Sequence, residues 1–238
     1  PGSDVSKLII NYDFSQKNEN WTGGFGNGYG TTKDDEGNTY TGVEAWNTTG
    51  DMYQTIENLK PGYYLVGING AFRPSNNRYS TNYAAGVYAN GIFNYFPTAI
   101  EDIVTADEAE DLVNCNLTGA GAHDFEVYDD FFSTSATQAE ELGASLMGYV
   151  VQGETGMAIA AKAGRYQAYT IAIVGEDGKL TVGIKNPGTH YSNDWTGWGA
   201  LKLTYCGDAE NEKAGEALDV VLENMKARAE SIFAYECE

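Results

Sequence analysis

The chain has 238 residues, of which 42% are hydrophobic and 13% aromatic, enough to fill the core of one large domain. Its 34 acidic and 14 basic side chains give a formal net charge of −20, which repels phosphate backbones and anionic head groups and excludes nucleic acid as an expected partner. No run approaches the ~20 apolar residues of a membrane span, so membrane insertion is not expected either. The 29 glycines argue against a helical bundle, because glycine in a helix interior costs about 1 kcal/mol relative to alanine.

The first hundred residues have the pattern of short strands separated by loops rich in glycine and asparagine. The clearest part is 51–73, where two alternating segments flank Pro61-Gly62, and we predict a β-hairpin closed by this turn. The glycines of 23–30 follow no buried strand and precede no helix, so they predict a flexible loop rather than a phosphate cradle. The predicted strands are 8–10, 41–46, 53–56, 63–72 and 83–89.

The middle of the chain, about 93–158, departs from this pattern and is predicted to be an α-containing insertion between strands of a sandwich. Short helices are expected at 105–110, where acidic residues would lie near the helix N-terminus, and at 135–142. An apolar and acidic patch separates them, with the large side chains Phe125, Val127, Tyr128, Phe131 and Phe132.

Strands return from residue 165, with alternation over 166–173, and Asp177-Gly178 predicts a second hairpin turn. The strands 180–184 and 201–205 follow, and a helix is expected over 208–235 with Asp208 as its cap. The predicted domains are therefore a sandwich over 1–207 and a C-terminal helix over 208–238, which packs on the sandwich or begins a linker or a next domain.

The three cysteines, Cys115, Cys206 and Cys237, are too few for a disulfide scaffold and their spacing matches no zinc motif. Whether any of them pair stays open.

Enzyme motifs are missing from the sequence. It has two histidines and no G-x-S-x-G, H-E-x-x-H or P-loop pattern. Paired carboxylates are frequent, but a glycosidase needs two carboxylates at a set separation in space, which a sequence cannot show. Surface solubility is the simpler reading of so many acids.

Two aromatic and polar loops are the predicted binding site. Sugars present apolar C–H faces that stack on indole and phenol rings, while polar side chains hydrogen-bond the hydroxyls. The residues predicted to bind ligand on this basis are His190, Tyr191, Asn193, Asp194 and Trp195 in one loop and Arg78 and Tyr79 in the other. Trp21, Trp46 and Trp198 lie next to strands and are expected in the core.

In sequence order, several segments resemble the galactose-binding-like β-sandwich (jelly-roll) domains of secreted and surface glycan-processing proteins of Bacteroidetes. The resemblance covers residues 8–205 apart from the insertion. It rests on Asn11-Tyr12-Asp13-Phe14 with Trp21, Glu44-Ala45-Trp46-Asn47, Tyr53-Gln54-Thr55-Ile56, Leu59-Lys60-Pro61-Gly62-Tyr63-Tyr64, Ala71-Phe72-Arg73, Gly178-Lys179-Leu180-Thr181-Val182-Gly183-Ile184-Lys185 and Trp195-Thr196-Gly197-Trp198.

This resemblance implies an all-β jelly-roll fold and a non-catalytic module similar to carbohydrate-binding modules. Many such domains hold a structural calcium, for which Asp13 and Glu44 are the candidate ligands here. The chain departs from the family at 199–201, where Gly-Ala-Leu replaces a frequent Asp-Asn-Phe, and the six or more oxygens of a calcium site cannot be assembled from the sequence. No other cofactor is required.

The predicted function is glycan binding by an accessory domain of a longer extracellular or cell-surface protein. Two alternatives stay open. One is a structural or protein-interaction spacer within a multidomain surface protein, and the other is a glycoside hydrolase with an unrecognised carboxylate pair.

Overall fold

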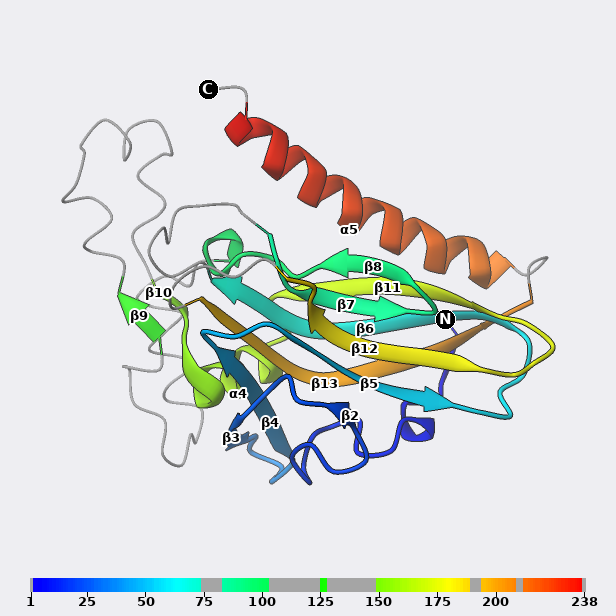
Figure 1. Cartoon of the computed structure of the whole chain (residues 1–238), viewed down its shortest axis with the longest axis horizontal. Helices are drawn as coiled ribbons and strands as arrows, with labels where there is room; N and C mark the ends of the chain where they lie inside the picture. The colour runs from blue at the N-terminus through cyan, green and yellow to red at the C-terminus, as the bar shows by residue number, and fades with distance from the viewer. Residues whose placement is uncertain are drawn as a thin grey trace.

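The computed structural model describes residues 2–73, 83–102, 125–127, 149–188, 194–208 and 212–236. It consists of two antiparallel β-sheets packed face to face, with two helices on the outside (Figure 1). The helices predicted at 105–110 and 135–142 lie outside the described residues, as do Cys115 and Cys237.

The first sheet has six strands and the second has five. Neighbours in the first are β11 (Gln167–Val174), β6 (Gly62–Arg73), β13 (Trp195–Gly207), β4 (Thr39–Trp46) and β3 (Gly28–Lys33), with β1 (Ser3–Asp4) also paired to β13. Neighbours in the second are β2 (Thr22–Gly23), β5 (Gly50–Ile56), β12 (Leu180–Asn186), β7 (Gly86–Ala89) and β8 (Ile92–Tyr95). The short strands β9 (Phe125–Val127) and β10 (Tyr149–Val151) pair with each other.

The strand order is that of a jelly roll. Four strands in the order β4-β13-β6-β11 face four strands in the order β5-β12-β7-β8. The chain passes from one sheet to the other at β4–β5, β5–β6, β6–β7, β11–β12 and β12–β13. This arrangement confirms the predicted all-β jelly-roll sandwich.

The core lies between the sheets because alternate residues of each strand point inward. Trp198 is completely buried and stacks on Phe25 with ring centroids 5.3 Å apart. Trp21 is also buried and stacks on Phe14, so the core prediction is confirmed for these two tryptophans. It is wrong for Trp46, whose side chain lies on the outer face of β4 and is 58% exposed.

Both predicted hairpins are wrong, because each joins strands of different sheets. β5 pairs with β2 and β12, whereas β6 pairs with β11 and β13. The segment around Pro61-Gly62 is therefore an arch across the sandwich, and the same holds for Asp177-Gly178 between β11 and β12. Two successive strands with alternating apolar residues can bury those residues either as neighbours in one sheet or as members of two sheets that face each other. Only the tertiary contacts decide between these two arrangements.

A true hairpin joins β7 and β8 through Asn90-Gly91, whose φ angles of 45° and 84° suit a type I′ turn. The insertion therefore begins after β8 rather than at residue 93. The strand predicted at 8–10 is also wrong: a 3₁₀ helix, η1 (Ser6–Leu8), ends at Leu8, and a bend and a turn follow at residues 9 and 10. The predicted flexible loop at 23–30 contains the end of β2 and the start of β3.

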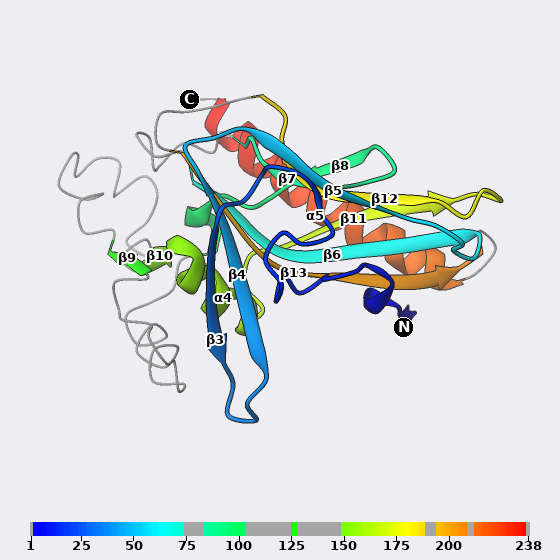
Figure 2. The same cartoon turned by 60° about the horizontal axis from the view of Figure 1, so that its bottom comes forward.

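Two helices cover the outer face of the first sheet (Figures 1 and 2). α4 (Gly153–Lys162) lies on β3, β4 and β13. α5 (Glu212–Glu236) contacts β11, β6 and β13, and its Val221 is buried against Ile171 and Cys206, a buried free thiol. α5 begins four residues after Asp208, the predicted cap. In the part of the chain that the structure describes, no helix has the length and apolar character needed to cross a bilayer.

Candidate functional site

An aromatic and charged cluster lies on the outer face of the first sheet, at the edge where β6 and β4 end and β13 begins. Trp195 pairs in register with both Arg73 of β6 and Trp46 of β4, so the three side chains form a row on one face. Glu44 lies two residues before Trp46 and shares that face. With Gln152 and Glu154 of the α4 N-terminus, we call these residues the Trp46 cluster.

Trp46 is the exposed aromatic residue of the cluster, whereas Trp195 is buried and supports the side chains around it. The Trp195 side chain is only 2% exposed. Its ring lies over Gly197, where an added Cβ would be 2.2 Å from the ring, and its Nε1 donates a 2.8 Å hydrogen bond to Oε2 of Glu44. Because the Trp195 ring is covered, Trp46 presents the accessible indole of the cluster.

Glu44 is held in an unusual electrostatic environment. Burial raises the pKa of its carboxyl above the ordinary value and the neighbouring Glu154 raises it further, while the Trp195 hydrogen bond and Arg73 act in the opposite direction. Glycine at position 28 leaves room for this side chain, because a Cβ there would be 2.4 Å from Cγ of Glu44. Burial and Glu154 therefore make ionisation of Glu44 less favourable than it is for a carboxyl in water.

Arg73 links the sheet to α4. Its guanidinium donates to Oε1 of Gln152 at 3.2 Å, and its Cζ lies 5.9 Å from the centroid of the Trp195 ring. Arg73 is also the residue before the segment 74–82, which contains the predicted Arg78 and Tyr79. Arg73 belongs to a segment that carries the family resemblance, but it is not among the residues predicted to bind ligand; its signal is a basic residue ending a strand that is otherwise buried.

Most of the predicted site residues cannot be placed. His190, Tyr191, Asn193, Arg78 and Tyr79 lie outside the described residues. Asp194 is described and is 1% exposed, and its backbone carbonyl accepts a 2.8 Å hydrogen bond from the amide of Asn47, next to Trp46. Asp194 thus lies beside the Trp46 cluster.

The candidate calcium ligands do not fit a calcium site. Asp13 accepts hydrogen bonds from the amide and hydroxyl of Ser15, and Glu44 accepts one from an indole while burial raises the pKa of its carboxyl. Calcium needs six or more oxygens, several of them charged. Within the described ranges, no three carboxylate, histidine or cysteine side chains come together as a metal site.

Glu44 and Glu154 are the facing carboxylates that the glycosidase alternative required. Glycosidases separate these groups by roughly 5 to 10 Å so that the sugar oxygen and a water fit between them. Here Glu154 lies near enough to raise the pKa of the Glu44 carboxyl. The pair is a place in the described residues where the glycoside hydrolase alternative would put its two carboxylates.

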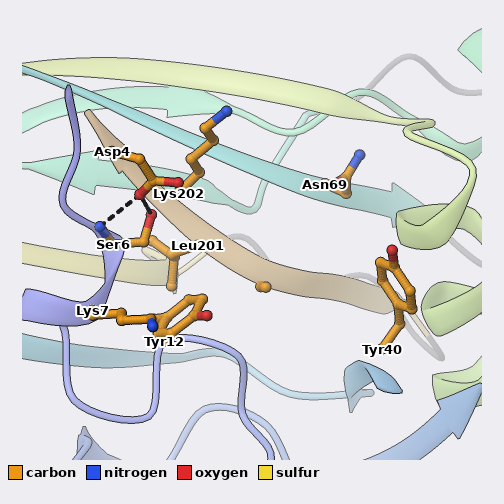
Figure 3. A pocket seen from close by; sticks show the side chains of 9 residues that line it. Asp4, Ser6, Lys7, Tyr12, Tyr40, Asn69, Leu201 and Lys202 are labelled. Atoms are coloured by element: carbon orange, nitrogen blue, oxygen red, sulfur yellow. Dashed lines mark hydrogen bonds between the residues drawn. The ribbon is translucent and has the colours of Figure 1, made fainter. Parts of the chain in front are cut away.

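A second candidate is a groove elsewhere on the outer face of the first sheet, with a volume of about 780 Å³ (Figure 3). The N-terminal segment forms one wall, β13 the floor, and β4 and β6 contribute the far side. We call it the sheet groove; its lining residues are Asp4, Ser6, Lys7, Tyr12, Tyr40, Asn69, Ala200, Leu201 and Lys202. Sequence reasoning missed it because it combines residues from four distant segments.

The fold and these surfaces define a jelly-roll β-sandwich whose first sheet carries an exposed tryptophan cluster and a groove. No protein-family model matches the chain, and no curated protein sequence is significantly similar to it.

Among solved structures, the chain is similar to TmCBM61 in complex with beta-1,4-galactotriose, with a TM-score of 0.36 and 11% identity over 83% of this chain and 97% of that one. It is also similar to a sugar-binding-protein candidate from Bacteroides thetaiotaomicron VPI-5482, with a TM-score of 0.27 and 12% identity over 74% and 80% of the two chains. At these scores neither likeness defines a ligand for this chain.

Proposed function

We propose that the protein is a non-catalytic glycan-binding domain whose ligand stacks on Trp46. The exposure of this one side chain carries the proposal: Trp46 is 58% exposed, whereas Trp21, Trp195 and Trp198 are all buried. An indole at the end of a strand, facing solvent without a packing role, is typical of a binding surface.

The neighbours of Trp46 supply the polar half of such a site. The Glu44 carboxyl can accept a hydrogen bond from a hydroxyl, and the Arg73 guanidinium carries hydrogen-bond donors. The predicted residues of 189–193 and 74–82 would complete the site, because these segments adjoin Asp194 and Arg73. A few fixed polar groups beside an apolar platform are the usual composition of a small-ligand site.

The family resemblance supports the wider setting of this proposal, an accessory domain of a secreted or surface protein that processes glycans. The non-catalytic part of the proposal is supported by the sequence, which has no G-x-S-x-G, H-E-x-x-H or P-loop motif.

Replacing Trp46 by alanine tests the proposal. Titration of the protein against plant, mucin and host N-glycan oligosaccharides is expected to find a ligand, and W46A should weaken its binding at least about tenfold, as expected for a central aromatic contact. W46A should melt at nearly the wild-type temperature, since the side chain is exposed.

Tyr95→Ala is the matched control, because Tyr95 is an exposed aromatic of the second sheet. It should leave glycan affinity unchanged. A domain that binds none of the glycans, or binds equally well after W46A, would contradict the proposal.

The spacer or protein-interaction alternative is favoured by one observation. α5 leaves four apolar side chains exposed beside the buried Val221: Leu218, Val220, Leu222 and Met225. The glycan titration separates the two functions, because an interaction domain would show no Trp46-dependent affinity for sugars.

A further inference from the structure

The sheet groove carries a charge opposite in sign to that of the whole protein. Lys7 and Lys202 both line it, in a chain with 34 acidic and 14 basic side chains. Both side chains are exposed, and neither forms a salt bridge with any residue that the structure describes. Two ammonium groups are therefore available to an incoming anion.

The acidic side chain of the groove, Asp4, already accepts hydrogen bonds within the protein. Its Oδ1 accepts hydrogen bonds from the amide of Ser6 at 2.9 Å and from the Ser6 hydroxyl at 2.6 Å (Figure 3). These bonds lower the pKa of Asp4, and Lys202 and Lys7 lower it further, so Asp4 is ionised at neutral pH. Two lysines and one carboxylate leave this end of the groove with a net positive charge.

The same bonds fix the wall of the groove. The hydroxyl of Ser6 accepts a 2.9 Å hydrogen bond from the amide of Leu203, which ties the N-terminal segment to β13. Lys7 follows in sequence, and Lys202 precedes Leu203 on β13. The two ammonium groups therefore project from backbone that is already anchored, which limits the entropy lost when a ligand binds.

Two tyrosines give the groove aromatic surface. The backbone carbonyl of Tyr12 accepts a 2.9 Å hydrogen bond from the amide of Leu201, and the half-buried ring packs partly on the core. Tyr40 is half-buried on β4, and both burial and Asp34 raise the pKa of its phenol, which stays neutral. Asn69 is also fixed, because its amide donates to the carbonyl of Arg165 at 2.6 Å.

We propose that the sheet groove is a second binding site, for a saccharide that carries carboxylates, such as an oligomer of uronic acids. The lysines suit the carboxylates and the tyrosines suit the sugar rings. A volume of about 780 Å³ is within the range of small-ligand sites, roughly 300–1,000 Å³, and far larger than a simple inorganic anion needs. Nucleic acid is disfavoured by the net charge of −20.

This inference goes beyond the proposed function. The sheet groove and the Trp46 cluster share no residue. A ligand of the groove is selected by charge, whereas a ligand of Trp46 is selected by its apolar face. Each site therefore keeps its ligand when the other is mutated.

Calorimetric titration with two forms of one oligosaccharide tests the second site. The probes are oligogalacturonic acid and its fully methyl-esterified form, which share a backbone and differ in charge. The acid form should bind at least about tenfold more tightly, and its affinity should fall as sodium chloride is added. The double variant K7Q/K202Q should lose at least about tenfold in affinity for the acid form, and K7R/K202R should keep it.

The double variant K179Q/K226Q is the matched control. Both lysines are exposed and lie outside the groove, so it changes the net charge equally and should leave the affinity unchanged. W46A should bind the acid form as the wild type does. Equal affinity for both probes, no binding of the acid form, or full affinity in K7Q/K202Q would each overturn the second site. None of these results bears on W46A and its glycan, so the two proposals fail separately.

Discussion

Two tryptophans that pair across neighbouring strands differ in their exposure to solvent. Trp195 and Trp46 are in register, yet Trp195 is 2% exposed and Trp46 is 58% exposed. Trp195 lies on β13 between two neighbouring strands, and its indole bonds to Glu44 over Gly197. Which indole is available for binding thus depends on where its strand lies in the sheet. A short stretch of sequence does not contain this information.

The Glu44 carboxyl leads to a prediction about pH. Its folded pKa is raised above 4.5, so the folded state binds more protons than the unfolded state between these two values. Stability therefore falls as the pH rises through this window, and the loss is complete above the folded pKa. Glu44→Gln keeps the acceptor for Trp195 and removes the buried charge.

We expect E44Q to be more stable than the wild type at about pH 7.5 and equal to it near pH 4, as measured by urea denaturation. Glu19→Gln, at an exposed position with no contact to the cluster, is the control and should match the wild type at both pH values. A stability gain that is the same at both pH values would contradict the raised pKa.

At the scale of elements, α4 sits directly on the backbone of the first sheet. An added Cβ would be 2.5 Å from the Thr155 amide at Gly30 and 1.9 Å from the Glu154 carbonyl at Gly42. Both glycines face each other across β3 and β4. Glycine at these positions is needed because only a strand without side chains allows the helix to approach so closely.

Gly42→Ala should therefore destabilise the protein by about 1–3 kcal/mol, because the blocking atoms are backbone and cannot rotate away. Gly24→Ala, where an added Cβ meets nothing within 4 Å, should change stability by no more than about 0.5 kcal/mol. Thermal or urea unfolding of the two variants measures the difference. Equal stabilities would show that α4 does not rest on β4 as described.

The strands themselves were largely predictable. The predicted segments 41–46, 53–56 and 63–72 lie within β4, β5 and β6, because alternation and turn residues are local signals. Strand pairing was not predictable, and both proposed hairpins are arches between sheets. The β7–β8 hairpin carries Asn90-Gly91, a strong short-range hairpin signal that was not used for a prediction, and β3 and β4 form a further hairpin.

At the scale of the whole molecule, the main electrostatic feature is the large negative net charge. With a net charge of −20, the carboxylates of the protein repel each other. This repulsion is larger in the folded state than in the extended chain, because folding brings the charges closer together. Salt screens exposed charges beyond roughly 10 Å at about 0.1 M ionic strength.

Raising sodium chloride from about 10 mM to about 150 mM at pH 7.5 should therefore increase the melting temperature by a few degrees. The same addition near the isoelectric point of about 4.3 is the control, and its effect should be much smaller. A melting temperature that falls with salt at pH 7.5 would mean that attractive ion pairs outweigh the repulsion.

By itself, the sequence determined the fold class, most of the long strands and the acidic surface, because composition and alternation are properties of local segments. The tertiary structure decided that Trp195 is buried and that Trp46 is exposed. It also brought together the residues that line one groove, among them Lys7, Tyr12, Tyr40 and Lys202. Strands distant in the chain become neighbours only when both sheets bury their inner faces, and that requirement selects one pairing among many with the same local pattern.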